Sequence, residues 1–212
     1  MQPTAISQPF AKVVGLSGTL VTLLSIRASM RVVTYVVFKV AAPPPGEISE
    51  ESFNNLRLLD GGLLGLENLL TLVTMILFLV WIYRVLAACR ATGRAAMSPG
   101  LGVGGWFIPL ANVVLPWLSV RSALRAVGAG TAIAGVWWLV WLVNTSLTGM
   151  HQLARQLMLV PELARALPLE MLDSIYGALD STFWPYFIAD TAAWGLLAFI
   201  VITVRKSVST AS

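Results

Sequence analysis

One apolar run, LLTLVTMILFLVWIY over residues 69–83, constrains the fold of this chain more than any other feature. No charged side chain lies between Glu67 and Arg84. A helix over about 61–88 is long enough to cross the ~30 Å hydrocarbon layer of a bilayer, because each helical residue adds about 1.5 Å. The run therefore predicts a membrane-spanning helix.

The composition extends this prediction to the whole chain. Hydrophobic residues make up 57% of it and charged residues only 11%, whereas a soluble domain carries about 25% charged residues. Too few polar side chains are present to cover a protein surface in water. We therefore predict an all-α fold, with residues 1–212 forming one integral membrane domain embedded in the lipid bilayer.

The rarest residue types exclude several kinds of site. A single cysteine, Cys89, excludes an internal disulfide and a cysteine-based metal site, and a single histidine, His151, excludes a histidine cluster. We interpret Cys89 as a small packing residue, with a juxtamembrane palmitoylation-type site as the alternative, and His151 as a solvated residue at the membrane interface. The net charge of +4 comes from basic residues at helix ends, which is not the pattern of a nucleic-acid-binding protein.

Three other segments are predicted to span the membrane, over about 12–42, 131–149 and 183–204. The first is too long for a cleavable signal peptide, and only Lys12 precedes it as a basic residue. A short surface helix is expected at about 52–59. The stretch over 150–182 is amphipathic.

The segment over about 103–127 differs from the other four. Pro109 and Pro116 lie in its apolar part, and each removes a backbone donor and clashes with the preceding turn of a helix. Its uninterrupted apolar stretch, before Arg121, is short for a span. This segment is expected to be broken, and its backbone must then be sheltered by other helices.

Loop charges decide between two topologies. The loops at 84–102 and 121–127 are basic, whereas the connections at 43–60 and 150–182 are mainly acidic. Five spans would place the two basic loops on opposite sides, against the tendency of Lys and Arg to remain in the cytoplasm. We predict four spanning helices plus one proline-broken re-entrant or interfacial helix, with both termini cytoplasmic. Five spans are the alternative.

A spaced set of residues resembles a known family. The set comprises Trp81, Tyr83, Arg84, Ser98–Pro99–Gly100, Gly104, Trp106–Phe107–Ile108–Pro109, Asn112, Pro116 and the Trp137–Trp138…Trp141 run. Over about residues 60–205 the chain resembles a bacterial membrane family known as domain of unknown function 4328. The resemblance implies a multi-pass bacterial membrane protein, and it carries no activity. We predict that the chain lies in the inner membrane.

Five polar residues within the predicted spans form the first candidate site: Arg27, Arg31, Glu67, Asn144 and Asp190. Counted from the cytoplasmic helix ends, they lie at a similar depth of ~22–28 Å. Charged groups at that depth are costly, and they usually face the bundle and pair. Three interpretations stay open: an ion-pair network that locks helix packing, arginines that extend to the headgroups, and a polar pocket for an ion, a proton or a small anion.

The proline-broken segment is the second candidate site. Its residues are Gly104, Gly105, Trp106, Pro109, Asn112 and Pro116, with Arg84 nearby. The N-terminus of a half-helix inside a bundle can hold an anion or carboxylate. The alternative is that the tryptophans are interfacial anchors and that Asn112 caps the broken backbone.

No motif in the chain identifies a reaction. We find no nucleophile arrangement, no phosphate-binding loop and no metal cluster, and the cofactor, if any, is unknown. Our first hypothesis is a non-enzymatic interaction or assembly subunit, with a protein partner or a second copy. The second is a small transporter or ion-conducting bundle. The third is a membrane enzyme that acts on a lipid, with Glu67 or Asp190 as base.

Overall fold

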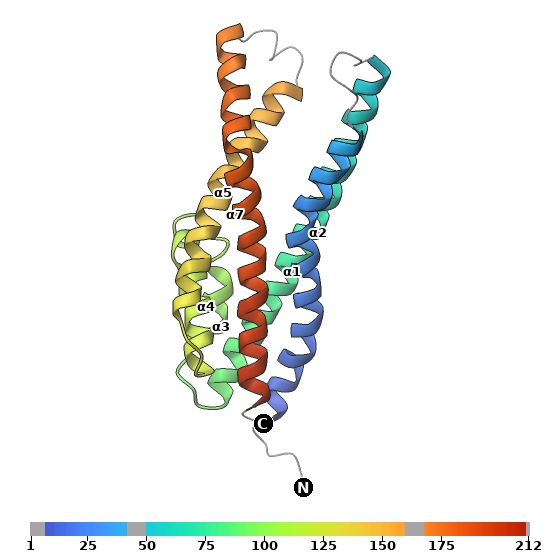
Figure 1. The fold of residues 1–212 in the computed structure, drawn as a ribbon. Coiled ribbons are helices and arrows are strands. Elements are labelled where there is room, and N and C mark those ends of the chain that lie inside the picture. The colour runs from blue at the N-terminus through green and yellow to red at the C-terminus, as the bar shows by residue number, and fades with distance from the viewer. Residues whose placement is uncertain (1–6, 42–49, 160–167, 211–212) are drawn as a thin grey trace.

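Four long helices dominate the structure, a computed structural model that describes residues 7–41, 50–159 and 168–210 (Figure 1). No β-strand occurs within these ranges. The helices are α1 (Ser7–Ala41), α2 (Glu50–Ala91), α3 (Pro99–Gly104), the 3₁₀ turn η1 (Ala111–Val113), α4 (Leu115–Ala126), α5 (Ala132–Leu159) and α7 (Leu169–Ser209).

The prediction of four spanning helices is confirmed. Four stretches are long and apolar enough to cross a membrane: Pro9–Val37, Gly61–Ala91, Ala132–Leu153 and Ser181–Ser209. The five-span alternative is wrong for the described residues. The longest helix between α2 and α5 is α4, whose 12 residues reach only ~18 Å.

Several helices extend beyond their predicted ends. The stretch expected as a separate surface helix at 52–59 is the first part of α2, which begins at Glu50. Likewise, α5 continues to Leu159 and α7 already begins at Leu169. The physical reason is that adding residues to an existing helix costs far less than nucleating a new one. Residues 160–167, within the stretch interpreted as amphipathic, lie outside the described residues.

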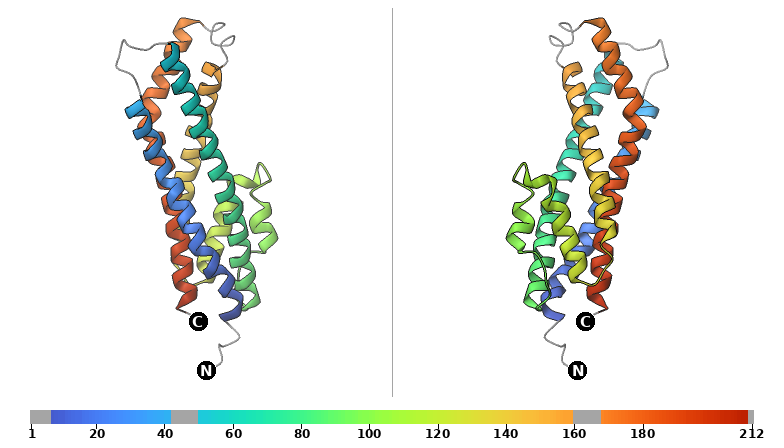
Figure 2. Two further views of the ribbon diagram at one scale, coloured as in Figure 1. Left: turned by 90° about the vertical axis from the view of Figure 1, so that its right-hand side faces the viewer. Right: turned by 90° about the vertical axis from the view of Figure 1, so that its left-hand side faces the viewer.

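The four long helices form an open arc in the order α2, α1, α7, α5. Helix α1 packs against both α2 and α7, and α5 packs against α7, whereas α2 and α5 barely touch. The segment α3–η1–α4, here called the hairpin (residues 99–126), packs against both α2 and α5. Figure 2 shows that the hairpin rises only part of the way along the bundle before it turns back. We call the end where α1 begins and α7 ends the terminal end, and the opposite one the far end.

The packed core lies in the terminal-end half of the bundle. Phe78, Trp81 and Trp137 are fully buried there, and Trp106 of the hairpin contacts the rings of Phe78 and Trp137 at centroid distances of 5.4 and 6.4 Å. Cys89 is also fully buried, so its interpretation as a packing residue is confirmed. The hairpin is thereby fastened to the core through an aromatic side chain.

Glycine and proline set the ends of the hairpin and of its neighbouring helices. Gly93 and Gly128 have φ of 74° and 77°, a left-handed conformation that ends α2 and α4 in closed turns. Ser98 caps α3 by accepting a hydrogen bond from the backbone N–H of Leu101. Pro116 lies in the first turn of α4, where its missing N–H would have no partner in any case.

Apolar side chains cover the outside of the bundle. On α2, Leu69 and Ile76 are 59% and 52% exposed, and at the turn of the hairpin Phe107 and Leu110 are 73% and 89% exposed. A protein in water rarely exposes large contiguous apolar patches. This surface therefore matches lipid as the surrounding solvent, at the spans and at the hairpin turn alike.

Gly105 packs closely against Leu115, on the other arm of the hairpin. A Cβ added there would overlap the Cβ and side chain of Leu115, whereas a Cβ added at the neighbouring Gly104 meets no atom within 4 Å. We therefore expect Gly105→Ala to lower the free energy of unfolding by about 1–3 kcal/mol, the usual cost of overpacking. Gly104→Ala is the matched control and should be close to neutral. Equal effects of the two changes on the thermal unfolding temperature in detergent would contradict this close packing.

Candidate functional site

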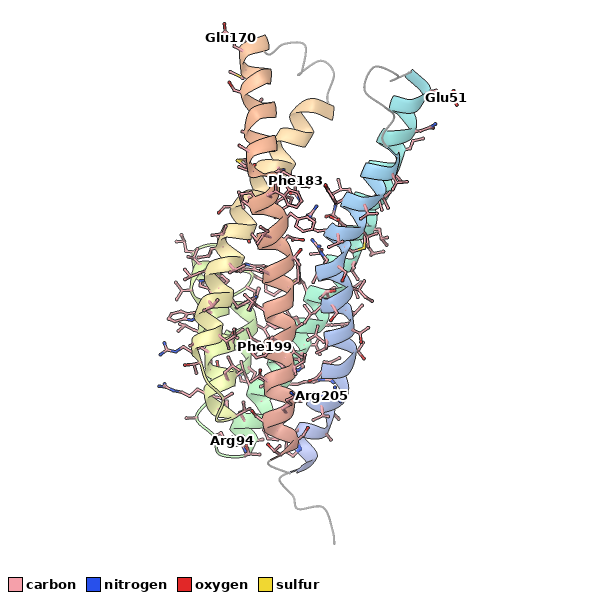
Figure 3. The ribbon with its side chains drawn as sticks, in the orientation of Figure 1. Glu51, Arg94, Glu170, Phe183, Phe199 and Arg205 are labelled. Atoms are coloured by element: carbon pink, nitrogen blue, oxygen red, sulfur yellow. The ribbon has the colours of Figure 1, made fainter. Side chains whose placement is uncertain are left out.

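The structure brings all five residues of the first candidate site together. Arg27, Arg31, Glu67, Asn144 and Asp190 come from four different helices and line one cavity of about 530 Å³. Figure 3 shows Phe183, another lining residue, at the level where the pair α1–α2 separates from the pair α5–α7. The cavity thus lies on the far-end side of the aromatic core.

Arg27 and Asp190 form the most deeply buried ion pair. Nη1 of Arg27 lies 3.0 Å from Oδ2 of Asp190, and Nη2 lies 3.4 Å from Oδ1, so that the guanidinium meets the carboxylate along two N–H groups. The third donor, Nε, hydrogen-bonds to Oγ1 of Thr71 at 2.8 Å. Only 5% of Arg27 and 1% of Asp190 is exposed. Helices α1, α2 and α7 are therefore joined at one point.

Arg31, one turn further along α1, is shared between two carboxylates. Its Nη1 lies 3.3 Å from Oε2 of Glu67, and its Nε lies 3.2 Å from Oδ2 of Asp190. Its Nη2 donates to the hydroxyl of Tyr186, and the guanidinium also lies 4.4 Å from the centre of that ring. Arg31 thus connects the α2 and α7 sides of the cavity.

Uncharged donors also hydrogen-bond to both carboxylates. Oδ1 of Asp190 accepts from Nδ2 of Asn144 at 3.4 Å and from Nε1 of Trp194 at 3.2 Å. Oε1 of Glu67 accepts from the hydroxyl of Thr34 at 2.9 Å. Each buried carboxylate therefore has both an arginine and a neutral donor, which is what a buried charge requires to be tolerated.

Together, the two arginines and two carboxylates carry no net charge. Both guanidinium groups point into the bundle, so the interpretation that they extend to the headgroups is wrong. The ion pairs that one interpretation expected are present and buried, and that they lock the packing of the helices stays a prediction. Because the same side chains line a cavity, the network also faces space that a ligand can occupy.

Uncharged polar groups and aromatic rings form the remainder of the cavity wall. Asn68 on α2, and Thr145 and Gln152 on α5, line it with exposed side chains that make no hydrogen bond to other side chains in the described part of the chain. Tyr35 and Phe183, with ring centres 5.7 Å apart, form an aromatic wall. The cavity thus combines paired charges, free hydrogen-bonding groups and apolar surface.

Sequence reasoning missed several residues that hold the network. Tyr186 and Trp194 lie four residues before and after Asp190, and so share its helix face. His151, interpreted as a solvated interfacial residue, instead lines the cavity, stacks on Tyr186 at 4.5 Å and hydrogen-bonds to Thr182. The four-residue spacing around Asp190 was a signal that could have identified Tyr186 and Trp194. The position of His151 depends on tertiary packing.

The residues of the second candidate site do not line a common cavity. Trp106 packs into the core with its Nε1 buried and without a hydrogen-bond partner in the described residues, and Gly105 is buried against Leu115. Pro109, Asn112 and Arg84 are exposed. The expectation that Asn112 caps the broken backbone is wrong, because neither η1 nor α4 has a side-chain cap.

The remaining hairpin residues have packing roles. Gly104 is half-buried with open space around it, and Pro116 is buried in the first turn of α4. None of the residues named for this segment lines the cavity described above. Within the described residues, no group of three or more His, Cys, Asp or Glu side chains is placed to hold a metal ion.

One of the comparisons with known proteins gives a match. A family model described as "Domain of unknown function (DUF4328)" matches residues 47–205. The chain belongs to this family. Within DUF4328, the matched region includes Glu67, Asn144 and Asp190, whereas Arg27 and Arg31 precede it. No curated protein and no solved structure shows significant similarity to the chain.

Proposed function

We propose that this DUF4328 protein binds a small polar or amphipathic molecule in the cavity, and that it serves as a binding or transport protein. The observation that supports this is a cavity of about 530 Å³ whose wall carries four ion-paired side chains. Ligand sites usually measure about 300–1,000 Å³ and combine apolar walls with a few convergent polar groups. Ionisable residues within spans commonly mark substrate or ion pathways.

The other hypotheses receive less support. An enzyme acting on a lipid would need Glu67 or Asp190 free to take a proton, whereas each is engaged by an arginine. An interaction or assembly subunit needs a surface suited to a partner, and the outer apolar surface is equally suited to lipid. A protein partner or second copy therefore stays a prediction.

We also propose the orientation of the chain in a bacterial inner membrane. Arg94 and Arg205 lie at the terminal end, and Glu51 and Glu170 lie at the far end (Figure 3). The positive-inside tendency then favours a cytoplasmic terminal end, a re-entrant hairpin that enters from the cytoplasm, and a cavity in the outer half of the membrane.

Thiol labelling tests this topology. In a Cys89→Ala background, cysteine replaces Gly100 at the start of the hairpin or Gly130 just after it, since both are exposed and a Cβ at either meets no atom within 4 Å. We expect a membrane-impermeant maleimide to label both positions only after the cytoplasmic side is opened to it. Labelling of the two positions from opposite sides would contradict the re-entrant hairpin.

Blocking the cavity tests the binding proposal. Thr145→Trp places a large ring on the cavity wall and replaces none of the ion-paired residues, whereas Val143→Trp places the same ring on the exposed outer face of α5. We expect native mass spectrometry of the protein, extracted with surrounding lipid, to detect a bound molecule on the wild type and on Val143→Trp. It should be lost from Thr145→Trp. If all three proteins carry the same molecules, the binding proposal fails.

A further inference from the structure

The cavity lies between the two long helices that do not pack together. Helices α2 and α5 end the arc, and the hairpin fills the space between them only toward the terminal end (Figure 2). Above the hairpin, exposed residues of both helices line the cavity: Asn68 on α2, and Thr145 and Gly149 on α5. The exposed lining residues thus lie on both sides of the gap between α2 and α5.

The charge balance of the wall restricts the ligand. With His151 counted as neutral, Arg27 and Arg31 offset the two carboxylates in number, so the wall carries no formal net charge. A ligand with a net charge would add an uncompensated charge at low dielectric, which costs several kcal/mol. A zwitterion avoids this cost, because its anionic group can pair with an arginine while its cationic group pairs with a carboxylate.

Depth in the membrane points to the source of such a ligand. Measured from Leu23, the middle residue of the Pro9–Val37 span, Arg27 and Arg31 lie about 6 and about 12 Å toward the far end. The hydrocarbon layer ends at about 15 Å from the bilayer centre. Arg31 therefore lies just inside the level of the lipid headgroups, and a headgroup needs only a small inward displacement to reach it.

Apolar surface continues from the cavity into the surrounding lipid. Leu64 lines the cavity, and Leu72, one helical turn below Asn68 on the same side of α2, is 58% exposed. The turn of the hairpin, with exposed Phe107 and Leu110, lies below the gap. A molecule whose polar end occupies the cavity can thus keep an apolar tail against protein and lipid.

We propose that the ligand is a zwitterionic phospholipid of the outer leaflet. Its headgroup enters between α2 and α5, with the phosphate at Arg31 and the ammonium at Glu67. This inference rests on the proposed function, because it names the class of molecule that the cavity binds. The same headgroup chemistry in a water-soluble molecule is the competing source.

Lipid competition measures the preference directly. Purified full-length protein in detergent receives an equal mixture of phosphatidylethanolamine and the anionic phosphatidylglycerol, and native mass spectrometry counts the bound molecules. We expect about tenfold more phosphatidylethanolamine, which corresponds to 1.4 kcal/mol. Soluble phosphoethanolamine at the same concentration should not displace it. Equal or greater binding of phosphatidylglycerol would overturn the proposal that the ligand is zwitterionic. Displacement by phosphoethanolamine would overturn the proposal that the ligand is a lipid.

Two variants test whether the lipid binds at the cavity. Arg31→Gln combined with Glu67→Gln keeps the cavity wall neutral and leaves the Arg27–Asp190 pair in place. It should abolish the binding of phosphatidylethanolamine, because both charges of the headgroup lose their partners. Thr145→Trp should lose the bound lipid and replaces none of the ion-paired residues, so it tests the inference if the double variant does not fold. If Thr145→Trp loses some other molecule and no phospholipid preference exists, the proposed function stands and this inference falls. If Thr145→Trp loses no bound molecule, both the proposed function and this inference fall.

Discussion

Replacing Asp190 with asparagine is expected to lower the free energy of unfolding by about 3–5 kcal/mol, as when one partner of a buried ion pair is removed. The side chain keeps its shape but loses its charge, and both arginines depend on that charge. Arg27 is only 5% exposed, so water cannot replace the lost carboxylate. Denaturant or thermal unfolding of the detergent-solubilised protein measures the loss.

Glu170→Gln supplies the control for this prediction. It makes the same kind of change at an exposed acid on the same helix, α7, at the far end. Exposed acids contribute little to stability, so no measurable change is expected. If Asp190→Asn unfolds as the wild type does, the ion pairs described above do not hold α1, α2 and α7 together.

The pair formed by Arg31 and Glu67 should show strong energetic coupling. Each single change to glutamine leaves one unbalanced charge beside the cavity and should destabilise the protein by about 3 kcal/mol. The double change restores neutrality and should cost less than the two single changes together. For residues in direct contact, we expect a coupling of about 0.5–3 kcal/mol.

A second cycle shows whether this coupling is local. Arg31→Gln combined with Glu170→Gln also removes one charge of each sign, but Glu170 lies at the far end of α7, away from the network. The two changes should therefore add within error. A coupling as large as that of Arg31 with Glu67 would mean that net charge, and not the contact at 3.3 Å, governs stability.

Hydrophobic pattern and helical rise were sufficient to predict much of this structure. The four spans follow from length and hydropathy, because lipid accepts only segments that satisfy their own backbone groups. The approximate depth of Arg27, Glu67 and Asp190 follows from counting residues along each helix. That they meet follows from the cost of leaving a charge unpaired in lipid.

The lateral arrangement of the helices could not be predicted in this way. Nothing in the sequence states that α2 and α5 stay apart while α1 and α7 pack together, because neighbour choice depends on side-chain fit between segments distant in sequence. The same limit hid the positions of His151 and Trp106, which are fixed by contacts with Tyr186 and Phe78. The cavity depends on the separation of α2 from α5, and so it too could not be predicted from the sequence.

A structure of the full chain in a lipid bilayer containing phosphatidylethanolamine and phosphatidylglycerol tests the central proposal most directly. We expect an elongated density between α2 and α5, with its polar end against Arg31 and Glu67 and its tail leaving above the hairpin. A cavity closed by direct packing of α2 against α5, or filled by the protein's own side chains, would contradict the proposal that the chain binds a ligand there.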